Sequence, residues 1–216
     1  MNIDDIIENQ NNNNSKGHLI IISGPAGSGK STVLKELFNF AEYKFSVSAT
    51  TRKPRIGEID GIDYKFISKE EFEQKISDGE MLEYVEYSDN YYGTLLKPVE
   101  KLLKEKYNVI LEIEVEGALN VKEKFPESIM IFLTPPTYCE LEKRLRSRGT
   151  ESEEVINRRL ERGKKEIKCI DKYDYIVINE INMHKKAAYD IHCIVEAEKN
   201  KISQEKAEKF LKEYFM

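Results

Sequence analysis

One glycine-rich segment, GPAGSGKS at residues 24–31, constrains this chain more than any other part of its sequence. It matches the pattern G-x-x-x-x-G-K-[ST]. It lies between a short apolar run at residues 18–23 and a stretch with helical spacing of apolar residues from about Ser31. In such a loop the glycines let successive backbone N–H groups turn towards phosphate oxygens, and the following helix adds its positive end. The segment therefore predicts a strand–loop–helix unit that binds the phosphates of a nucleoside triphosphate.

Short apolar runs that alternate with helical stretches predict the rest of the core. Helices are expected from Ser68 to Gly79, because Ser68 and Glu71 have capping-box spacing, and again from Pro98 onwards. Further buried strands are expected at residues 43–48, 109–111, 129–133 and 175–178. This alternation favours an α/β fold with a parallel sheet, although it would allow many functions.

Composition narrows the class of protein. The 216 residues are 40% hydrophobic and 34% charged, which suits one folded domain. The sequence contains no run of 18 apolar residues, so we expect no membrane-spanning helix. The net charge of −5 argues against a dedicated nucleic-acid-binding protein. Residues 1–16 contain an asparagine run and lack the basic and apolar regions of a signal peptide, so we expect a disordered leader.

Cys139, Cys169 and Cys193 are too few for a disulfide scaffold or a zinc site. We expect them to be buried or unreactive in a cytoplasmic protein.

A second basic cluster follows the strand predicted at residues 43–48. Residues 46–66 have the pattern S-x-S-x-T-T-R-x-x-R-x-G-E-x-x-G-x-D-Y-x-F, and NYYGT follows at residues 90–94. Arg52 and Arg55 are three residues apart, so two guanidinium forks could hold one phosphate group. Spacing alone leaves open a second interpretation, a solvated loop with a pair of surface arginines.

A charged helical stretch lies between the last two predicted strands. It contains RLRSRGTE at residues 144–151 and RRL at residues 158–160. Capping-box spacing occurs twice, at Thr137 with Glu140 and at Thr150 with Glu153. Taken alone, this stretch is compatible with a solvated pair of helices with local ion pairs. In a nucleotide kinase the same pattern is typical of a lid.

The motifs, in this order, make residues 17–199 similar to the guanylate kinases. The resemblance implies a phosphate-loop core of three layers with a parallel sheet, a small GMP-binding insertion with mixed strands, and a helical lid. It divides the chain into the leader at residues 1–16, the core with the phosphate loop at 17–46, the GMP-binding domain at 47–97, further core at 98–138, the lid at 139–168, and core with C-terminal helices at 169–216. The implied reaction transfers the γ-phosphoryl group of ATP, with Mg²⁺, to GMP or dGMP in purine nucleotide metabolism.

The resemblance also implies roles for individual residues. ATP would bind to Gly24, Pro25, Ala26, Gly27, Ser28, Gly29, Lys30, Ser31 and Thr32, with Arg144 and Asn179 near the adenine and Ser31 as the Mg²⁺ ligand. The GMP phosphate would be held by Arg52, Arg55, Tyr64 and Tyr92. Its guanine edge would be read by Ser48, Glu83 and Thr94, with Glu114 close by. Lys30, Arg52, Arg148 and Arg159 would be the catalytic residues, whereas Arg146, Arg158 and Arg162 receive no role.

Three residues depart from the family's usual pattern. Ala26 stands where many members have serine, and little effect is expected because only the backbone is needed there. Glu114 and Glu116 stand where aspartate and glutamine are usual. Glu114 is therefore one methylene longer than the usual residue.

Two other functions remain as alternatives. One is a catalytically inactive guanylate-kinase-like domain that binds proteins, and the other is a kinase for another nucleoside monophosphate. Lys30 and Ser31 speak against the first, because inactive domains of this kind typically have degraded phosphate loops. Glu83 speaks against the second, because a carboxylate can accept the N1–H and amino protons of guanine. No N-K-x-D signature of a GTPase is present.

The C-terminal stretch has apolar residues on one helical face. They are Ala207, Phe210, Leu211, Tyr214 and Phe215. We expect this face to pack in the core, and an oligomer contact is the alternative. The three histidines show no metal-ligand or nucleophile spacing.

Overall fold

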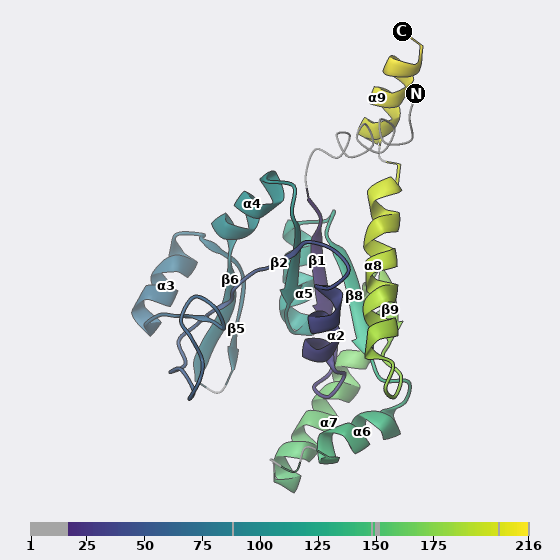
Figure 1. Ribbon diagram of the computed structural model, residues 1–216. Helices are drawn as coiled ribbons and strands as arrows, with labels where there is room; N and C mark the ends of the chain where they lie inside the picture. The colour runs from purple at the N-terminus through teal and green to yellow at the C-terminus, as the bar shows by residue number, and fades with distance from the viewer. Residues whose placement is uncertain (1–16, 88, 148, 150–151, 203, 216) are drawn as a thin grey trace.

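The computed structural model describes residues 17–87, 89–147, 149, 152–202 and 204–215 (Figure 1). The disordered leader expected at residues 1–16 lies outside these residues. A five-stranded sheet forms the centre, with the strands in the order β2-β7-β1-β8-β9 and every neighbouring pair parallel. Its strands are β1 (Leu19–Ser23), β2 (Tyr43–Phe45), β7 (Asn108–Glu112), β8 (Ile129–Thr134) and β9 (Tyr175–Ile178). The predicted α/β fold with a parallel sheet is confirmed.

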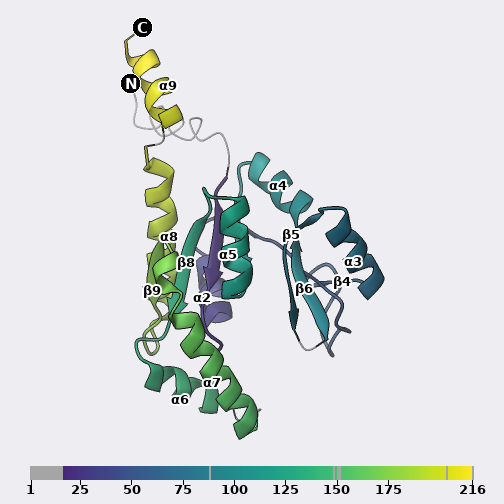
Figure 2. The same cartoon turned by 180° about the vertical axis from the view of Figure 1, so that it is seen from behind.

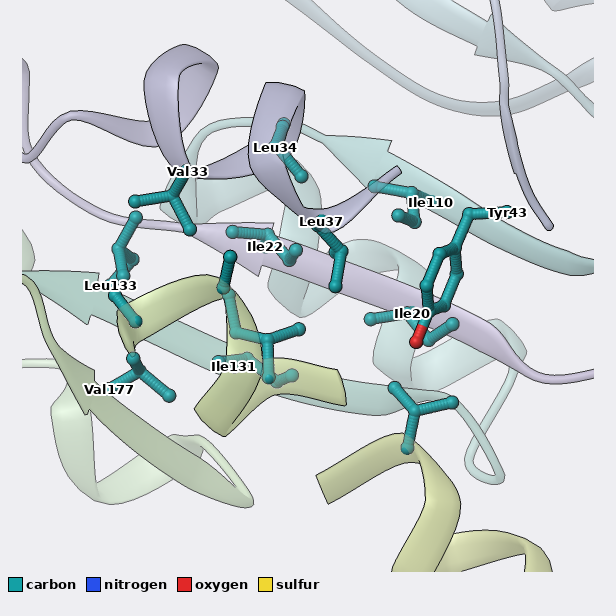
Figure 3. Packing of buried hydrophobic residues seen from close by; sticks show 14 of the residues in the cluster. Ile20, Ile22, Val33, Leu34, Leu37, Tyr43, Ile110, Ile131, Leu133 and Val177 are labelled. Carbon is teal, nitrogen blue, oxygen red and sulfur yellow. The ribbon is translucent and has the colours of Figure 1, made fainter. Parts of the chain in front are cut away.

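Alternate residues of the central strands supply two hydrophobic clusters, one on each face of the sheet. Ile20 and Ile22 of β1 face helices α2 (Lys30–Leu37) and α8 (His184–Asn200), as Figure 3 shows for the strand and α2. Leu19 and Ile21 face helices α4 (Leu96–Lys104) and α5 (Val115–Lys124) on the opposite side, which Figure 2 shows from behind. Because both faces are covered, the strands consist of nearly continuous apolar residues, as their sequences predicted.

A second, smaller sheet stands beside the core. Its strand order is β4-β3-β6-β5, formed by β3 (Ala49–Thr50), β4 (Lys65–Phe66), β5 (Met81–Tyr87) and β6 (Asn90–Leu95). β3 runs parallel to β4 and antiparallel to β6, so the expectation of mixed strands is confirmed. Helix α3 (Lys69–Ser77) covers this sheet through the buried ring of Phe72. The helix begins where expected, because Ser68 Oγ accepts a hydrogen bond from the Glu71 backbone N–H at 3.1 Å.

Helices α6 (Tyr138–Ser147) and α7 (Glu153–Ile167) pack against each other near the phosphate loop (Figure 1). Thr137 Oγ1 caps the first of them by accepting a hydrogen bond from the Glu140 N–H at 3.1 Å, as predicted. The second predicted capping pair involves Thr150, which lies outside the described residues. Ser152 occupies the N-cap position of α7. A short 3₁₀ helix at Ile170–Lys172 leads into β9.

The C-terminal helix corrects one prediction. Helix α9 (Gln204–Tyr214) extends beyond the end of α8 and away from the sheet (Figure 1). The side chains of Phe210, Leu211 and Tyr214 are therefore exposed. The prediction that this apolar face packs in the core is wrong. Helical periodicity identifies an apolar face, whereas the direction of the chain after α8 decides whether anything covers it.

For the cysteines, which we expected to be buried or unreactive, the structure tests burial, and their low reactivity stays a prediction. Cys139 and Cys193 are exposed and Cys169 is half-buried, so the expected burial is not found. Two of the three lie on the solvent side of amphipathic helices, where a small side chain does not have to be buried. In the described part of the chain, no helix has the length and apolar character needed to cross a membrane.

Candidate active site

The phosphate loop joins the carboxyl end of β1 to the first residue of α2. Gly24, Gly27 and Gly29 have φ angles of +152°, +89° and +88°, conformations that side-chain-bearing residues rarely adopt. A Cβ atom on Gly24 would lie 2.0 Å from the Leu133 carbonyl oxygen of the neighbouring strand. The glycines are thus required both by backbone conformation and by close packing on β8. The amino end of α2 consequently points into the loop, which suits an anion.

Lys30 folds back over this loop. Its Nζ donates hydrogen bonds to the carbonyl oxygens of Gly24 at 2.6 Å and of Pro25 at 3.4 Å. The side chain is half-buried, and these two contacts hold the ammonium group against the start of the loop. A phosphate group bound by the loop would therefore meet a positive charge that is already in place.

Ser31 meets a carboxylate that the sequence analysis did not assign. The Ser31 hydroxyl donates to Glu112 Oε1 at 3.5 Å, and Glu112 ends β7 directly beside β1 in the sheet. Burial raises the pKa of the Glu112 carboxyl group, and the charge of Lys30 opposes this shift. Hydroxyl and carboxylate oxygens suit a hard cation such as Mg²⁺, so these two residues could hold one. The sequence feature that could have identified Glu112 is an acidic residue at the end of a buried strand, as in other phosphate-loop proteins.

Arg144 and Asn179 lie together on another side of the loop. Asn179 is buried, and its Nδ2 donates to the Ser28 carbonyl oxygen at 2.8 Å. Arg144 of α6 donates to the Asn179 carbonyl oxygen at 2.9 Å and to Glu140 Oε1 at 2.7 Å. Gly29 leaves room for this contact, since a Cβ atom there would lie 2.4 Å from Asn179 Nδ2. The two residues expected near the adenine therefore form one hydrogen-bonded group with the loop.

Arg52 forms a planar ion pair in the segment between β3 and β4. Its two terminal nitrogens donate to the two carboxylate oxygens of Glu58 at 3.0 and 2.9 Å. The guanidinium carbon lies 5.5 Å from the ring centre of Tyr64, and the rings of Tyr64 and Tyr92 are 6.0 Å apart. Hydrogen bonds from Arg52 and from the Arg55 backbone N–H hold the pKa of Glu58 below its usual range.

The structure thus brings together three of the residues expected at the GMP phosphate, Arg52, Tyr64 and Tyr92. The side chain of the fourth, Arg55, is exposed. Glu58 was quoted in the motif of residues 46–66 without a role. The sequence feature that could have indicated a role for Glu58 is the position of an acidic residue within reach of two arginines.

Glu83 is a buried carboxylate in the second sheet, with only 4% of its surface exposed. It lies opposite Thr94 in the β5–β6 pair, and Thr94 Oγ1 donates to Glu83 Oε1 at 2.8 Å. Burial raises the pKa of this carboxyl group, while the hydrogen bonds from Thr94 and the charge of Lys124 oppose the shift. The second oxygen, Oε2, faces Gly117 in the first turns of α5. Ser48, the other residue expected at the guanine, is half-buried and directly precedes β3.

Glu114 lies at the N-cap of α5 and forms an ion pair with Arg162 of α7. Arg162 also donates from Nε to Glu166 Oε1 at 3.0 Å. Arg162 had no assigned role, because its sequence position gave no indication of partners on another element. Arg159 is half-buried on the same helix, and Glu116 is exposed in the first turn of α5. Arg148, expected to be catalytic, lies outside the described residues.

The fold and the loop geometry place this chain among the phosphate-loop nucleotide-binding proteins, with a helix pair beside the loop and an added sheet. Residues 16–208 match the family model described as guanylate kinase. Guanylate kinase from Streptococcus mutans is 52% identical over 185 residues, which are 85% of this chain and 87% of that protein. The guanylate kinase of Oceanobacillus iheyensis is 50% identical over 184 residues, covering 85% and 88%. The crystal structure of guanylate kinase from Anaplasma phagocytophilum superimposes with a TM-score of 0.68 at 31% identity, covering 87% of this chain and 88% of that one. The chain belongs to the guanylate kinase family.

Proposed function

We propose that this protein transfers the γ-phosphoryl group of ATP to GMP or dGMP, giving ADP and GDP or dGDP. The observation that carries the choice of acceptor is Glu83, a buried carboxylate fixed by Thr94. The proposal takes residues 47–97 as the GMP-binding domain and residues 139–168 as the lid.

The phosphate loop is the ATP side of the proposed site. Backbone N–H groups of residues 24–32 would bind the phosphate oxygens, and Lys30 would neutralise charge on the β- and γ-phosphates. Arg144 and Asn179 would lie against the adenine. Ser31 and Glu112 are the residues that would hold Mg²⁺, which when bound supplies further neutralisation of the phosphate charge.

Glu83 explains why guanine would be the acceptor base. Guanine presents an N1–H group and an exocyclic amine on one edge, and one carboxylate can accept hydrogen bonds from both. Adenine has no N1–H donor there, so it would leave Glu83 unpaired in a desolvated pocket. Thr94 and Ser48 would complete the contacts to the guanine edge, and Glu114 would lie close by.

Arg52, Arg55, Tyr64 and Tyr92 would hold the acceptor phosphate. The ion pair with Glu58 and the Tyr64 ring already hold the Arg52 guanidinium in one orientation, which reduces the entropy lost on binding. An oxygen of this phosphate attacks the γ-phosphorus, and the bond from the γ-phosphorus to the bridging oxygen of ADP breaks. No general base is needed, because the acceptor phosphate is largely ionised at neutral pH. Catalysis then consists of alignment and charge stabilisation by Lys30, Arg52, Arg148 and Arg159.

A coupled assay of ADP release tests this proposal. The purified chain is incubated with ATP and Mg²⁺ and with GMP, AMP, dTMP or no acceptor. We expect rapid ADP release with GMP alone. Release with AMP or dTMP at the same rate would indicate a different nucleoside monophosphate kinase. No release above the rate without acceptor would favour a catalytically inactive interaction domain.

A further inference from the structure

Arg162 of helix α7 pairs with two carboxylates, one on another element and one on α7 itself. Its terminal nitrogen pairs with Glu114 Oε2, and its Nε donates to Glu166 Oε1 at 3.0 Å. Glu114 occupies the N-cap position of α5, two residues after the end of β7, whereas Glu166 lies on α7 itself. One planar guanidinium therefore bridges the two acidic groups through different N–H groups, which the fork of arginine allows.

Glu166 lies on the face of α7 that packs against the phosphate loop. A Cβ atom on Gly163 would be 3.3 Å from Pro25 Cβ, so the backbone of α7 approaches the loop closely there. Glu166 follows three residues later and shares that face. Its side chain is only 12% exposed. Burial raises the pKa of its carboxyl group, and the charges of Arg162 and Lys30 oppose the shift. Glu166 therefore lies within the electrostatic influence of the phosphate-loop lysine.

The importance of this ion pair comes from where Arg162 lies on α7 and not from the stability that the pair contributes. Half-exposed pairs contribute little to stability, and Arg162 and Glu114 have exposed side-chain fractions of 41% and 49%. Arg159 lies three residues before Arg162 on α7, so the same helical face carries an arginine that we assign to phosphoryl transfer. Any contact that fixes the position of α7 relative to Glu114 and Lys30 therefore also fixes Arg159.

We propose that Arg162 is a positioning residue that ties α7 to the acceptor side of the site through Glu114, while its pair with Glu166 on the same helix holds the guanidinium in place beside the phosphate loop. The proposal rests on the function proposed above. Because Arg162 holds Glu114 Oε2, the other oxygen, Oε1, is left to accept a hydrogen bond from the guanine amino group. The extra methylene of Glu114, compared with aspartate, extends its carboxylate to both partners.

The test compares Arg162→Ala and Arg162→Lys with Arg158→Ala as the matched control. Arg158 is an exposed arginine on the same helix, and alanine favours a helix at either position. We expect Arg162→Ala to raise KM for GMP about fivefold and to lower kcat about fivefold, with a melting temperature close to the parent's. Arg162→Lys should restore at most one of the two constants towards the parent's value, because an ammonium group lacks the planar fork of the guanidinium group. Arg158→Ala should stay within about twofold of the parent in both constants.

A double-mutant cycle with Glu114→Gln completes the test. If Arg162 acts through Glu114, the double variant should have a KM for GMP that is at least about threefold lower than the product of the single effects predicts. Independent single effects, or equal effects of Arg162→Ala and Arg158→Ala, would overturn the proposal. The parent's preference among acceptors tests the proposed function separately. If that preference is for another acceptor, the same ratios measured with that acceptor and with ATP still decide the role of Arg162.

Discussion

The carboxylate of Glu83 occupies the space that a side chain at position 117 would need. A Cβ atom on Gly117 would lie 2.7 Å from Glu83 Oε2, where β5 of the second sheet meets α5 of the core. Glycine inside a helix costs about 1 kcal/mol relative to alanine. The glycine at this position therefore leaves room for the Glu83 carboxylate at the expense of local helix stability.

Gly117→Ala should separate stability from substrate binding. The added methyl group favours the helix, and the end of the Glu83 side chain can move aside, so the free energy of unfolding should stay within about 1 kcal/mol of the parent's. The displaced carboxylate should raise KM for GMP about tenfold while KM for ATP stays unchanged. Steady-state kinetics with each substrate varied provide the measurement, with Asn120→Ala on the exposed side of α5 as the control. An unchanged KM for GMP would show that Glu83 has no need of this space.

Glu83→Gln should abolish the choice between bases. The amide presents an NH₂ group to guanine donors, so we expect a loss of about 2–4 kcal/mol in transition-state binding of GMP. AMP, already a poor acceptor, should lose much less. IMP, which keeps N1–H and lacks the amine, should fall between GMP and AMP with the parent enzyme. The measurement is kcat/KM for the three acceptors. Glu86→Gln, an exposed change on the same strand, should preserve the parent's GMP/AMP ratio. If Glu83→Gln also preserves it, Glu83 does not read the base.

The same substitution should stabilise the folded protein at neutral and alkaline pH. Burial raises the folded-state pKa of Glu83 above its unfolded value. The stabilising contribution of the protonated group is therefore complete below the unfolded pKa and is lost as the pH rises through the folded pKa. Glu83→Gln removes this loss, so its free energy of unfolding should exceed the parent's at pH 8. The gain should shrink towards pH 4.5. Urea unfolding of both proteins at the two pH values measures this gain in the free energy of unfolding. An equal gain at both pH values would show that it does not come from the titration of Glu83.

Lys30→Met should leave the fold intact and reduce kcat by at least about 10²-fold, the scale for losing one charge stabiliser of the transition state. Methionine fills the volume of the lysine stem without the ammonium group. Lys35→Met, which changes an exposed lysine on the same helix, is the control and should have nearly parental turnover. Parental turnover by purified Lys30→Met would remove Lys30 from the mechanism.

Phe210→Ala and Phe132→Ala should differ strongly in stability. Phe210 of α9 is 62% exposed, whereas Phe132 of β8 is fully buried. Loss of the buried ring should cost about 3–5 kcal/mol, and loss of the exposed ring about 0.5 kcal/mol or less. Denaturant unfolding of both variants at several protein concentrations provides the comparison. A large, concentration-dependent cost for Phe210→Ala would instead favour the oligomer contact that the sequence left open.

The sequence by itself determined the phosphate loop, the strands of the central sheet and the family. These features depend on local patterns. Positive φ angles require glycine at positions such as 27 and 29, and a strand buried on both faces requires a run such as Ile20 to Ile22. The capping of α3 by Ser68 was predictable for the same reason, since the donor is three residues away.

Only the tertiary structure decided which distant residues meet. Ser31 and Glu112 are 81 positions apart, and Arg162 and Glu114 are 48 apart, so no local pattern connects them. Strand order brings the first pair together, because β7 lies beside β1. The packing of α7 against the phosphate loop brings the second pair together. Likewise, an amphipathic pattern predicted helix α9 correctly but not its exposure, because burial depends on what the rest of the chain places against a face.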